Sequence, residues 1–276
     1  MENYTFYPVQ YADLVPLRNM QVRDLKGQEH DPIEEQIELS KPMCLFIRDL
    51  DEVIGYALID DKDIKDIILI EFYIIYLYRK NTKHVLKKLI QNYHISHWYV
   101  NSQDSFALPL MLEKNYPYEI DALIFSADPS TSHNYELEDE EYIVMAKLNE
   151  LQLVYQLVIE DGFYTGDGQE ALASRINNNE IYLLRSQEMP IGVGFVSPLR
   201  RTPEYADIAM IIKRPYRKKG FASKLVSHLI DVCRTKEVFP TALTSTTNIA
   251  SRKTLEKCGF YLDGYMLLAE INKIER

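Results

Sequence analysis

The sequence predicts an α/β or α+β protein with mixed β-sheets, in which two domains of one plan follow each other in tandem. Its 276 residues, 46% of them hydrophobic, suffice for two cores of ordinary size. Apolar runs typical of strands alternate along the chain with segments whose apolar residues recur at helical spacing. The two halves also share similar segments in the same order, which is the main argument for two domains.

The internal similarity consists of three pairs of segments. They are "LFIRDLDEVIGYALI" (45–59) with "YLLRSQEMPIGVGFV" (182–196), "YIIYLYRK" (73–80) with "IIKRPYRK" (211–218), and "SFALPLMLEKNYPY" (105–118) with "NIASRKTLEKCGFY" (248–261). The shift between the copies grows only from 137 to 143 residues, so short loop insertions explain it. A period of this length indicates a duplicated domain rather than a solenoid repeat.

We therefore predict a first domain over 1–126 and a second over 142–276. The segment between them, "ADPSTSHNYELEDEE" (127–141), is rich in small, polar and acidic residues and lacks apolar periodicity. Such a composition is typical of a linker.

The strands of the second copy are predicted from short apolar runs. Residues 141–148 alternate, 180–186 and 190–197 flank a short turn as a hairpin, and 205–213 form a mostly apolar central strand. Two further strands are expected over 241–245 and 265–271.

Helical spacing predicts the segments between these strands. Residues 149–161 have apolar residues on one face, with Asn149 as the expected N-cap, and a glycine-bearing loop leads into a second helix ending near 176. Helices are also expected over 221–236 and 249–259. The first copy has the same order of elements.

Charge and cysteine content limit the classes of function. Residues 1–140 carry 25 acidic and 13 basic side chains, whereas 141–276 carry 16 and 18, so neither half offers the dominant basic face of a nucleic-acid or membrane-surface protein. The three cysteines show no paired spacing, which indicates free thiols in a reducing compartment. With no secretory signal or membrane-length apolar run, we expect a cytoplasmic protein, and we predict no metal site.

The stretch "RPYRKKGFASKL" (214–225) joins the central strand to a helix. Unpaired N–H groups and the helix dipole favour an anion at such a helix start. Arg217, Lys218 and Lys219 add full positive charges, and Gly220 permits positive φ or close approach of a ligand. The alternative is a solvated helix start, although basic residues there oppose the dipole unless an anion is bound.

These segments together resemble the GNAT superfamily of acyl-CoA-dependent N-acyltransferases. The resemblance rests on the strand "IAMIIK", the R-x-x-G-x-A turn "RKKGFA" and the later segment "NIASRKTLEKCGF", and it covers 142–271. It implies that acetyl-CoA is the acyl donor. It also implies three groups of cofactor-binding residues. The turn would bind the pyrophosphate through Arg217, Lys218, Lys219, Gly220, Phe221, Ala222 and Ser223. The strand would bind pantetheine through Met210, Ile211 and Ile212, and the later segment would touch the cofactor through Asn248. Asn248 is equally suited to cap the helix that follows it.

For catalysis, the resemblance implies a carboxylate base on the central strand. Asp207 occupies that place and Glu204 is the second choice, although an acid at a strand start is also ordinary surface polarity. The tyrosine that usually protonates the thiolate is replaced by Leu255, so Tyr261, Tyr265 or solvent would have to take its role. Phe163, Tyr164 and Asp167 are expected to line the acceptor site, and Cys258 is expected to be a packing residue.

The first copy departs from the pattern at the turn. Its counterpart, "YRKNTKHVLKKL" (78–89), lacks the glycine and the small residue and is two residues shorter, so we expect a degenerate copy without cofactor binding. The first copy would then serve as a scaffold, or its acidic surface would form a wall of the acceptor site. Solubility is the simpler explanation for the acidic surface.

The sequence therefore favours an N-acetyltransferase that acts on a primary amine of a small molecule or protein. The alternative is a non-catalytic acyl-CoA-binding or scaffold protein. We expect no nucleic-acid or membrane partner, and a homo-oligomer is compatible with the sequence.

Overall fold

The computed structural model describes residues 4–24, 41–130, 136–160 and 168–271. The chain divides into two compact units. The first comprises Met1–Leu123 together with Gly264–Arg276, and the second comprises Ile124–Asp263. The first unit is thus discontinuous in sequence, whereas the second is continuous.

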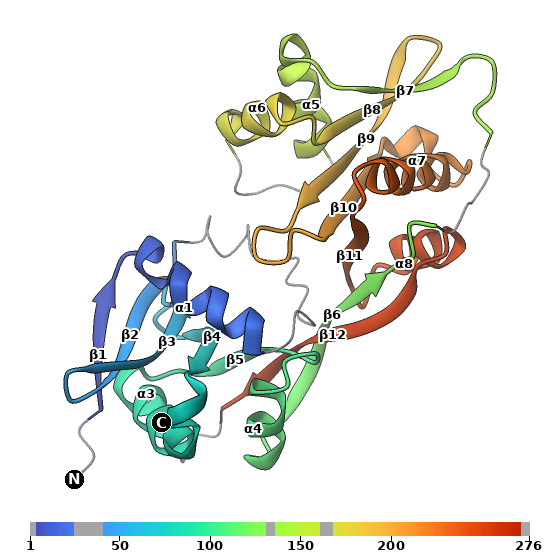
Figure 1. Cartoon of the computed structure of the whole chain (residues 1–276). Helices are drawn as coiled ribbons and strands as arrows, with labels where there is room; N and C mark the ends of the chain where they lie inside the picture. The colour runs from blue at the N-terminus through green and yellow to red at the C-terminus, as the bar shows by residue number, and fades with distance from the viewer. Residues whose placement is uncertain (1–3, 25–40, 131–135, 161–167, 272–276) are drawn as a thin grey trace. The chain divides into compact units, whose positions relative to one another are not determined.

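The first unit has a mixed sheet with strand order β1-β2-β3-β4-β5-β12 (Figure 1). Strands β1 to β4 are antiparallel neighbours, β4 and β5 are parallel, and β5 and β12 are antiparallel. Its elements are β1 (Tyr4–Val9), α1 (Tyr11–Asp24), β2 (Met43–Asp49), β3 (Glu52–Asp60), β4 (Ile68–Ile74), the 3-10 helix η1 (Tyr76–Asn81), α3 (Thr82–Tyr93), β5 (His97–Asn101), α4 (Ala107–Glu113), and the larger parts of β6 (Tyr118–Ser126) and β12 (Tyr261–Glu270).

The second unit repeats this plan with strand order β6-β11-β10-β9-β8-β7, and Ile124–Ser126 of β6 belong to it. Its central strand is antiparallel to one neighbour, β9, and parallel to the other, β11. Its elements are β7 (Glu141–Met145), η2 (Leu148–Glu150), α5 (Leu151–Ile159), α6 (Gln169–Asn177), β8 (Ile181–Ser186), β9 (Met189–Pro198), β10 (Tyr205–Ile212), η3 (Arg214–Tyr216), α7 (Phe221–Thr235), β11 (Phe239–Ser245) and α8 (Ile249–Lys257). The predicted α/β class with mixed sheets is confirmed.

Helices cover both faces of each sheet. In the second unit, α5 and α6 bury Val154, Leu157 and Leu172 against β8 to β10, and α7 packs on the opposite face (Figure 1). In the first unit, α3 and α4 contribute to one core cluster and α1 to the other. Successive side chains of a strand point to opposite faces of the sheet, so the central strands contribute residues to the core on each face.

Backbone details show the duplication at residue level. Arg48 Nη2 donates to the carbonyl of Asp51, and Arg185 Nη1 donates in the same way to Glu188. A β-bulge precedes each arginine, between Ile47 and Arg48 and between Leu184 and Arg185. Both hairpins therefore follow one template.

A glycine in each hairpin is required for strand contact. A Cβ at Gly192 would lie 2.6 Å from Ile212 Cδ1 and 2.9 Å from the carbonyl oxygen of Ile211. A Cβ at Gly55 would collide with the carbonyl of Tyr73 in the same way. Both glycines permit close pairing with the central strand of their unit.

Two sequence expectations need adjustment. The expected N-cap Asn149 lies inside the 3-10 turn η2, and α5 begins at Leu151, because the Glu150 carboxylate accepts a hydrogen bond from the Lys147 N–H and closes the turn first. Strand β12 begins at Tyr261 rather than at 265. The predicted domain ranges follow the repeated sequence segments, whereas the two compact units follow the contacts within the structure. The two definitions differ, so the predicted ranges stay a prediction.

Candidate functional site

The turn between β10 and α7 in the second unit has an unusual backbone. After the 3-10 helix η3, Arg217 is extended, Lys218 has φ 61° and Gly220 has φ 87° and ψ −11°. Helix α7 then begins at Phe221, and no side chain caps its N-terminus. The N–H groups of its first turn therefore face outward as potential anion ligands.

Gly220 is required by conformation rather than by crowding. A left-handed backbone costs an L-residue about 1 kcal/mol or more, which glycine avoids. A Cβ placed on Gly220 would meet nothing within 4 Å, so the space beside it is open. Open space next to unpaired N–H groups fits the close approach of a pyrophosphate, which is what the sequence analysis expected of this residue.

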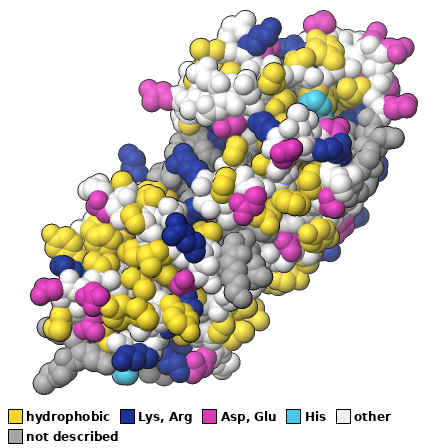
Figure 2. Space-filling model, in the orientation of Figure 1, with side chains coloured by type: hydrophobic (Ala, Val, Ile, Leu, Met, Phe, Trp, Pro, Cys, Tyr) yellow, Lys and Arg dark blue, Asp and Glu magenta, His cyan; other side chains and the backbone are white. Residues whose placement is uncertain are grey.

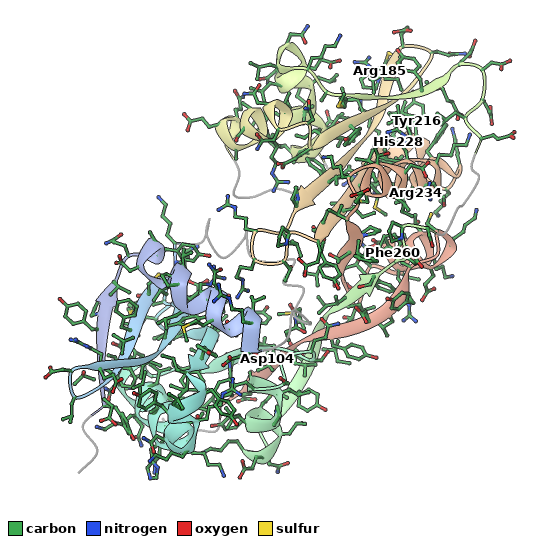
Figure 3. The ribbon with its side chains drawn as sticks, viewed as in Figure 1. Asp104, Arg185, Tyr216, His228, Arg234 and Phe260 are labelled. Carbon is green, nitrogen blue, oxygen red and sulfur yellow. The ribbon has the colours of Figure 1, made fainter. Side chains whose placement is uncertain are left out.

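The basic side chains of the turn have different surroundings. Arg217 Nε donates to the carbonyl of Ile212 at 2.8 Å, which ties the turn to the end of β10. Lys218 and Lys219 are exposed, and Lys219 Nζ lies 5.6 Å from the ring centre of Tyr216. Figure 3 labels Tyr216 next to the start of α7. The two lysines thus carry accessible positive charge beside the helix start.

Strands β10 and β11 separate in front of this turn. They pair only over Tyr205–Asp207 with Phe239–Thr241, although β10 continues to Ile212 and β11 to Ser245. The main chain of Met210, Ile211 and Ile212 is consequently not paired with β11 on that edge. This opening is what the resemblance implied for a pantetheine arm.

Asn248 lies at the end of the other separated strand. Its N–H donates to the carbonyl of Ser245, and its side-chain oxygen accepts from the Ser251 N–H at 3.1 Å, so it caps α8. The capping role predicted for it is therefore present. Because the side-chain oxygen caps the helix, a contact with a cofactor would use the side-chain NH2 group of this exposed residue.

Asp207 is half-buried near the start of β10. It is paired with Ser197 of β9, so both side chains project to the face covered by α5 and α6. Arg175 of α6 donates from Nη1 to the Ser197 hydroxyl at 3.0 Å and lies 5.8 Å from the Phe195 ring centre. A carboxylate, a hydroxyl and a guanidinium thus lie on one face.

The sequence did not single out Arg175 or Ser197. The two are separated by 22 positions, and nothing in either segment marks them. Only the register of β9 against β10 places Ser197 beside Asp207.

Glu204 directly precedes β10, and Tyr261 is the first residue of β12. Burial raises the pKa of the Tyr205 hydroxyl, and the nearby charges of Glu204, Asp263 and Tyr261 raise it further. Tyr261 is 56% exposed, and burial followed by the Asp263 and Asp128 charges raises its pKa.

Other residues expected near the site have ordinary structural surroundings. Leu255 and Cys258 are buried, and burial raises the pKa of the Cys258 thiol, as expected for a packing residue. Tyr265 belongs to the first unit and packs against its core. The expected acceptor residues Phe163, Tyr164 and Asp167 lie outside the described residues.

The corresponding turn of the first unit has a different backbone. The 3-10 helix η1 runs directly into α3, and Asn81, the residue before that helix, has φ −94° and ψ −4°. Arg79 Nε reaches the carbonyl of Ile74 at 3.4 Å, as Arg217 does for Ile212. The bond from the arginine to the carbonyl at the strand end is thus present in both copies, whereas the left-handed glycine turn is present only in the second.

Charge is mixed on the surface. Figure 2 shows Lys and Arg interspersed with Asp and Glu over the visible face of each unit. Within the ranges that the structure describes, no helix is both long and apolar enough to cross a bilayer. Among the same residues, no group of three or more His, Cys, Asp or Glu side chains could hold a metal ion.

Comparison with known proteins identifies both halves. Residues 13–128 match the model described as an acetyltransferase (GNAT) domain, and residues 145–260 match that of the acetyltransferase (GNAT) family. No curated protein sequence matches the chain.

Solved structures resemble the whole chain. A GNAT-family acetyltransferase from Colwellia psychrerythraea is 15% identical with a TM-score of 0.83, covering 97% of this chain and 100% of that one. A GCN5-related N-acetyltransferase from Sphaerobacter thermophilus is 15% identical with a TM-score of 0.67, covering 97% and 95%. A tandem GNAT protein from the clavulanic acid biosynthesis pathway is 12% identical with a TM-score of 0.63, covering 98% of each chain.

At these identities the structural likeness shows a shared fold, and the two family models show the affiliation. The chain belongs to the GNAT acetyltransferase superfamily and contains two GNAT domains in tandem.

Proposed function

We propose that the second unit transfers an acetyl group from acetyl-CoA to a primary amine of a small molecule or protein. The observation that carries this proposal is the open, left-handed Gly220 turn at the start of α7, next to the separated strands β10 and β11. The combination offers anion ligands and free strand main chain in one place.

The family resemblance names the residues that would hold acetyl-CoA, and this geometry supports them. Arg217, Lys218, Lys219 and the N–H groups of Gly220, Phe221, Ala222 and Ser223 would bind the pyrophosphate, and the main chain of Met210, Ile211 and Ile212 would pair with pantetheine. Asn248 would contact the cofactor from the end of β11. When bound, acetyl-CoA supplies the activated acyl group as a thioester.

Asp207 is the proposed general base. Its half-buried carboxylate lies on the α5 and α6 face of the central strand, where it would take the proton from the attacking amine directly or through water. Glu204 is the second choice, because it is exposed at the strand start. Tyr261 is the proposed proton donor in place of the usual tyrosine, because a tyrosine hydroxyl is protonated at neutral pH.

The cofactor assignment is tested by Gly220→Glu. The substitution puts an L-residue into a left-handed conformation and a negative charge where phosphates would bind, so acetyl-CoA affinity should fall by at least about 100-fold, or about 2.7 kcal/mol. The measurement is isothermal titration calorimetry. Asn81→Glu, at the matching helix start of the first unit, is the control and should leave the affinity unchanged. An unchanged affinity of Gly220→Glu would show that the site is elsewhere.

The catalytic assignment is tested by Asp207→Asn. Removing a general base typically lowers kcat by about 10²- to 10⁴-fold, and KM for acetyl-CoA should stay near its original value. Thiol release is measured against a panel of amines, with Glu204→Gln as the matched variant. If Glu204→Gln causes the loss and Asp207→Asn does not, the base is Glu204.

A non-catalytic acyl-CoA-binding or scaffold role is the second candidate, because the residue at the usual tyrosine position is the buried Leu255. It predicts acetyl-CoA binding without thiol release for any amine in the panel.

A further inference from the structure

Phe106 of the first unit lies directly before α4, and its ring is 7% exposed. Its ring centre is 6.0 Å from that of Phe72 and 6.1 Å from that of Tyr73. Phe72 and Tyr73 are neighbours on β4, so their side chains project to opposite faces of the sheet. They accordingly belong to the two different core clusters of the unit.

A ring that contacts both faces of a strand must lie at one of its edges. One edge of β4 is occupied, because Phe72 pairs with Ala57 and Tyr73 with Tyr56 of β3. The other edge is paired with β5 only at Ile68 and Leu69. Phe106 therefore fills the notch where β4 and β5 separate.

The same notch exists in the second unit between β10 and β11. The loops that follow the two parallel strands correspond, since the Asp104 N–H donates to the Asn101 carbonyl and the Asn248 N–H donates to the Ser245 carbonyl. Phe106 stands two residues after Asp104, and Ala250 stands two residues after Asn248, one position further than the sequence alignment, which pairs Phe106 with Ile249. Ala250 and Ile249 are both exposed and neither has a ring, so the second notch receives no ring from this position.

Charged groups hold Phe106 in place. The Arg79 guanidinium lies 4.8 Å from its ring centre and forms an ion pair with Asp24 of α1 at 3.2 Å. The Tyr73 hydroxyl donates to the same Asp24 carboxylate at 2.6 Å. The Asp104 carboxylate accepts from the Phe106 N–H at 2.7 Å. Backbone and ring are thus both fixed.

We propose that Phe106 occupies, in the first unit, the notch that takes the pantetheine arm of acyl-CoA in the second, so that the first unit is closed to acyl-CoA by its own side chain. The chain then binds one acyl-CoA molecule. The inference rests on the proposed function for the identity of the ligand.

Trp98 provides a local readout. It is the single tryptophan of the chain, it forms the last residue pair before β4 and β5 separate, and its ring centre is 6.2 Å from that of Phe72. Acetyl-CoA is titrated into the full chain by calorimetry and by tryptophan fluorescence. We expect one site and unchanged Trp98 emission, and no site in Gly220→Glu.

Two sites, or a site in Gly220→Glu that changes Trp98 emission, would overturn the proposal. If the wild-type chain binds no acetyl-CoA, the proposed function of the second unit fails, and the filling of the first notch by Phe106 is then decided by the quenching experiment on Phe106→Ala.

Phe106→Ala tests the ring itself. Its removal leaves a cavity beside Phe72, so acrylamide quenching of Trp98 should rise about twofold or more. Phe106→Leu is the matched variant with a smaller expected increase, and it carries the test if the alanine variant is unfolded by circular dichroism. Unchanged quenching in a folded variant would show that Phe106 does not close the notch.

Discussion

Asp104 and Asn248 occupy equivalent places in the two units but have different surroundings. Each accepts backbone hydrogen bonds at the start of the helix that follows, α4 or α8. Asp104 is 5% exposed, and burial raises the pKa of its carboxyl group, while the two backbone N–H groups and Arg79 oppose that rise and Glu71 adds to it. Asn248 is exposed and uncharged.

The raised pKa of Asp104 predicts a pH-dependent stability. The folded state holds the proton of the Asp104 carboxyl group more tightly than the unfolded state does. The contribution of this group to the stability of the fold is therefore largest below the ordinary pKa of an aspartate and is lost as pH rises through the raised pKa. Asp104→Asn keeps the oxygen that caps α4 and removes the buried charge. The variant should therefore be more stable than the wild type at neutral pH, with a smaller difference at acidic pH.

Urea unfolding followed by Trp98 fluorescence measures this difference, because Trp98 lies in the same unit. A variant less stable than the wild type at neutral pH would contradict the prediction.

Among single residues, the sequence could indicate those whose role is set by local conformation. Gly220 before a helix is such a case, since positive φ favours glycine. Arg175, Ser197 and Phe106 could not be found this way, because their positions depend on strand register and on contacts with residues far away in sequence.

At the scale of elements, β12 contributes to both units. Its residues Tyr261–Asp263 belong to the second unit, whereas Gly264–Glu270 belong to the first, where Met266–Glu270 pair with β5. Leu267 and Ala269 of this strand lie in the main core cluster of the first unit. The first unit therefore lacks a core strand until β12 is added.

Leu267→Ala tests the contribution of β12 to the first unit. Leu267 is 5% exposed, so its truncation should lower the free energy of unfolding by about 2 to 5 kcal/mol. The Trp98 unfolding transition reports the change, because Ala269 of the same strand pairs with Trp98.

Leu262→Ala is the control on the same strand. Leu262 is 39% exposed and belongs to the second unit, so the Trp98 transition should stay within about 0.5 kcal/mol of the wild type. Equal shifts in the two variants would show that β12 does not serve the first core specifically.

Most elements could be predicted from apolar periodicity, but their ends and partners could not. The separation of β10 from β11 leaves no mark in the alternation of "YADIAMII", since pairing partners do not change which face a side chain occupies. The early start of β12 at Tyr261 has a similar reason, because the turn signal at Gly259 precedes it and no apolar run marks it.

For the whole molecule, the repeated order of segments was sufficient to predict two domains of one plan, and the two family matches confirm it. The repeat could not reveal that Gly264–Arg276 joins the first unit, because sequence similarity shows which segments correspond and not which strands pair.

This division of β12 has a consequence for synthesis on the ribosome. The second unit is complete once Asp263 has emerged, whereas β5 must wait for a strand more than 160 residues further along. Pairing over such a separation is slow, because the chain entropy of closing a long loop must be overcome first. The half of the protein that is translated first is therefore expected to finish folding last, with its unpaired β5 edge available to chaperones until β12 has been synthesised.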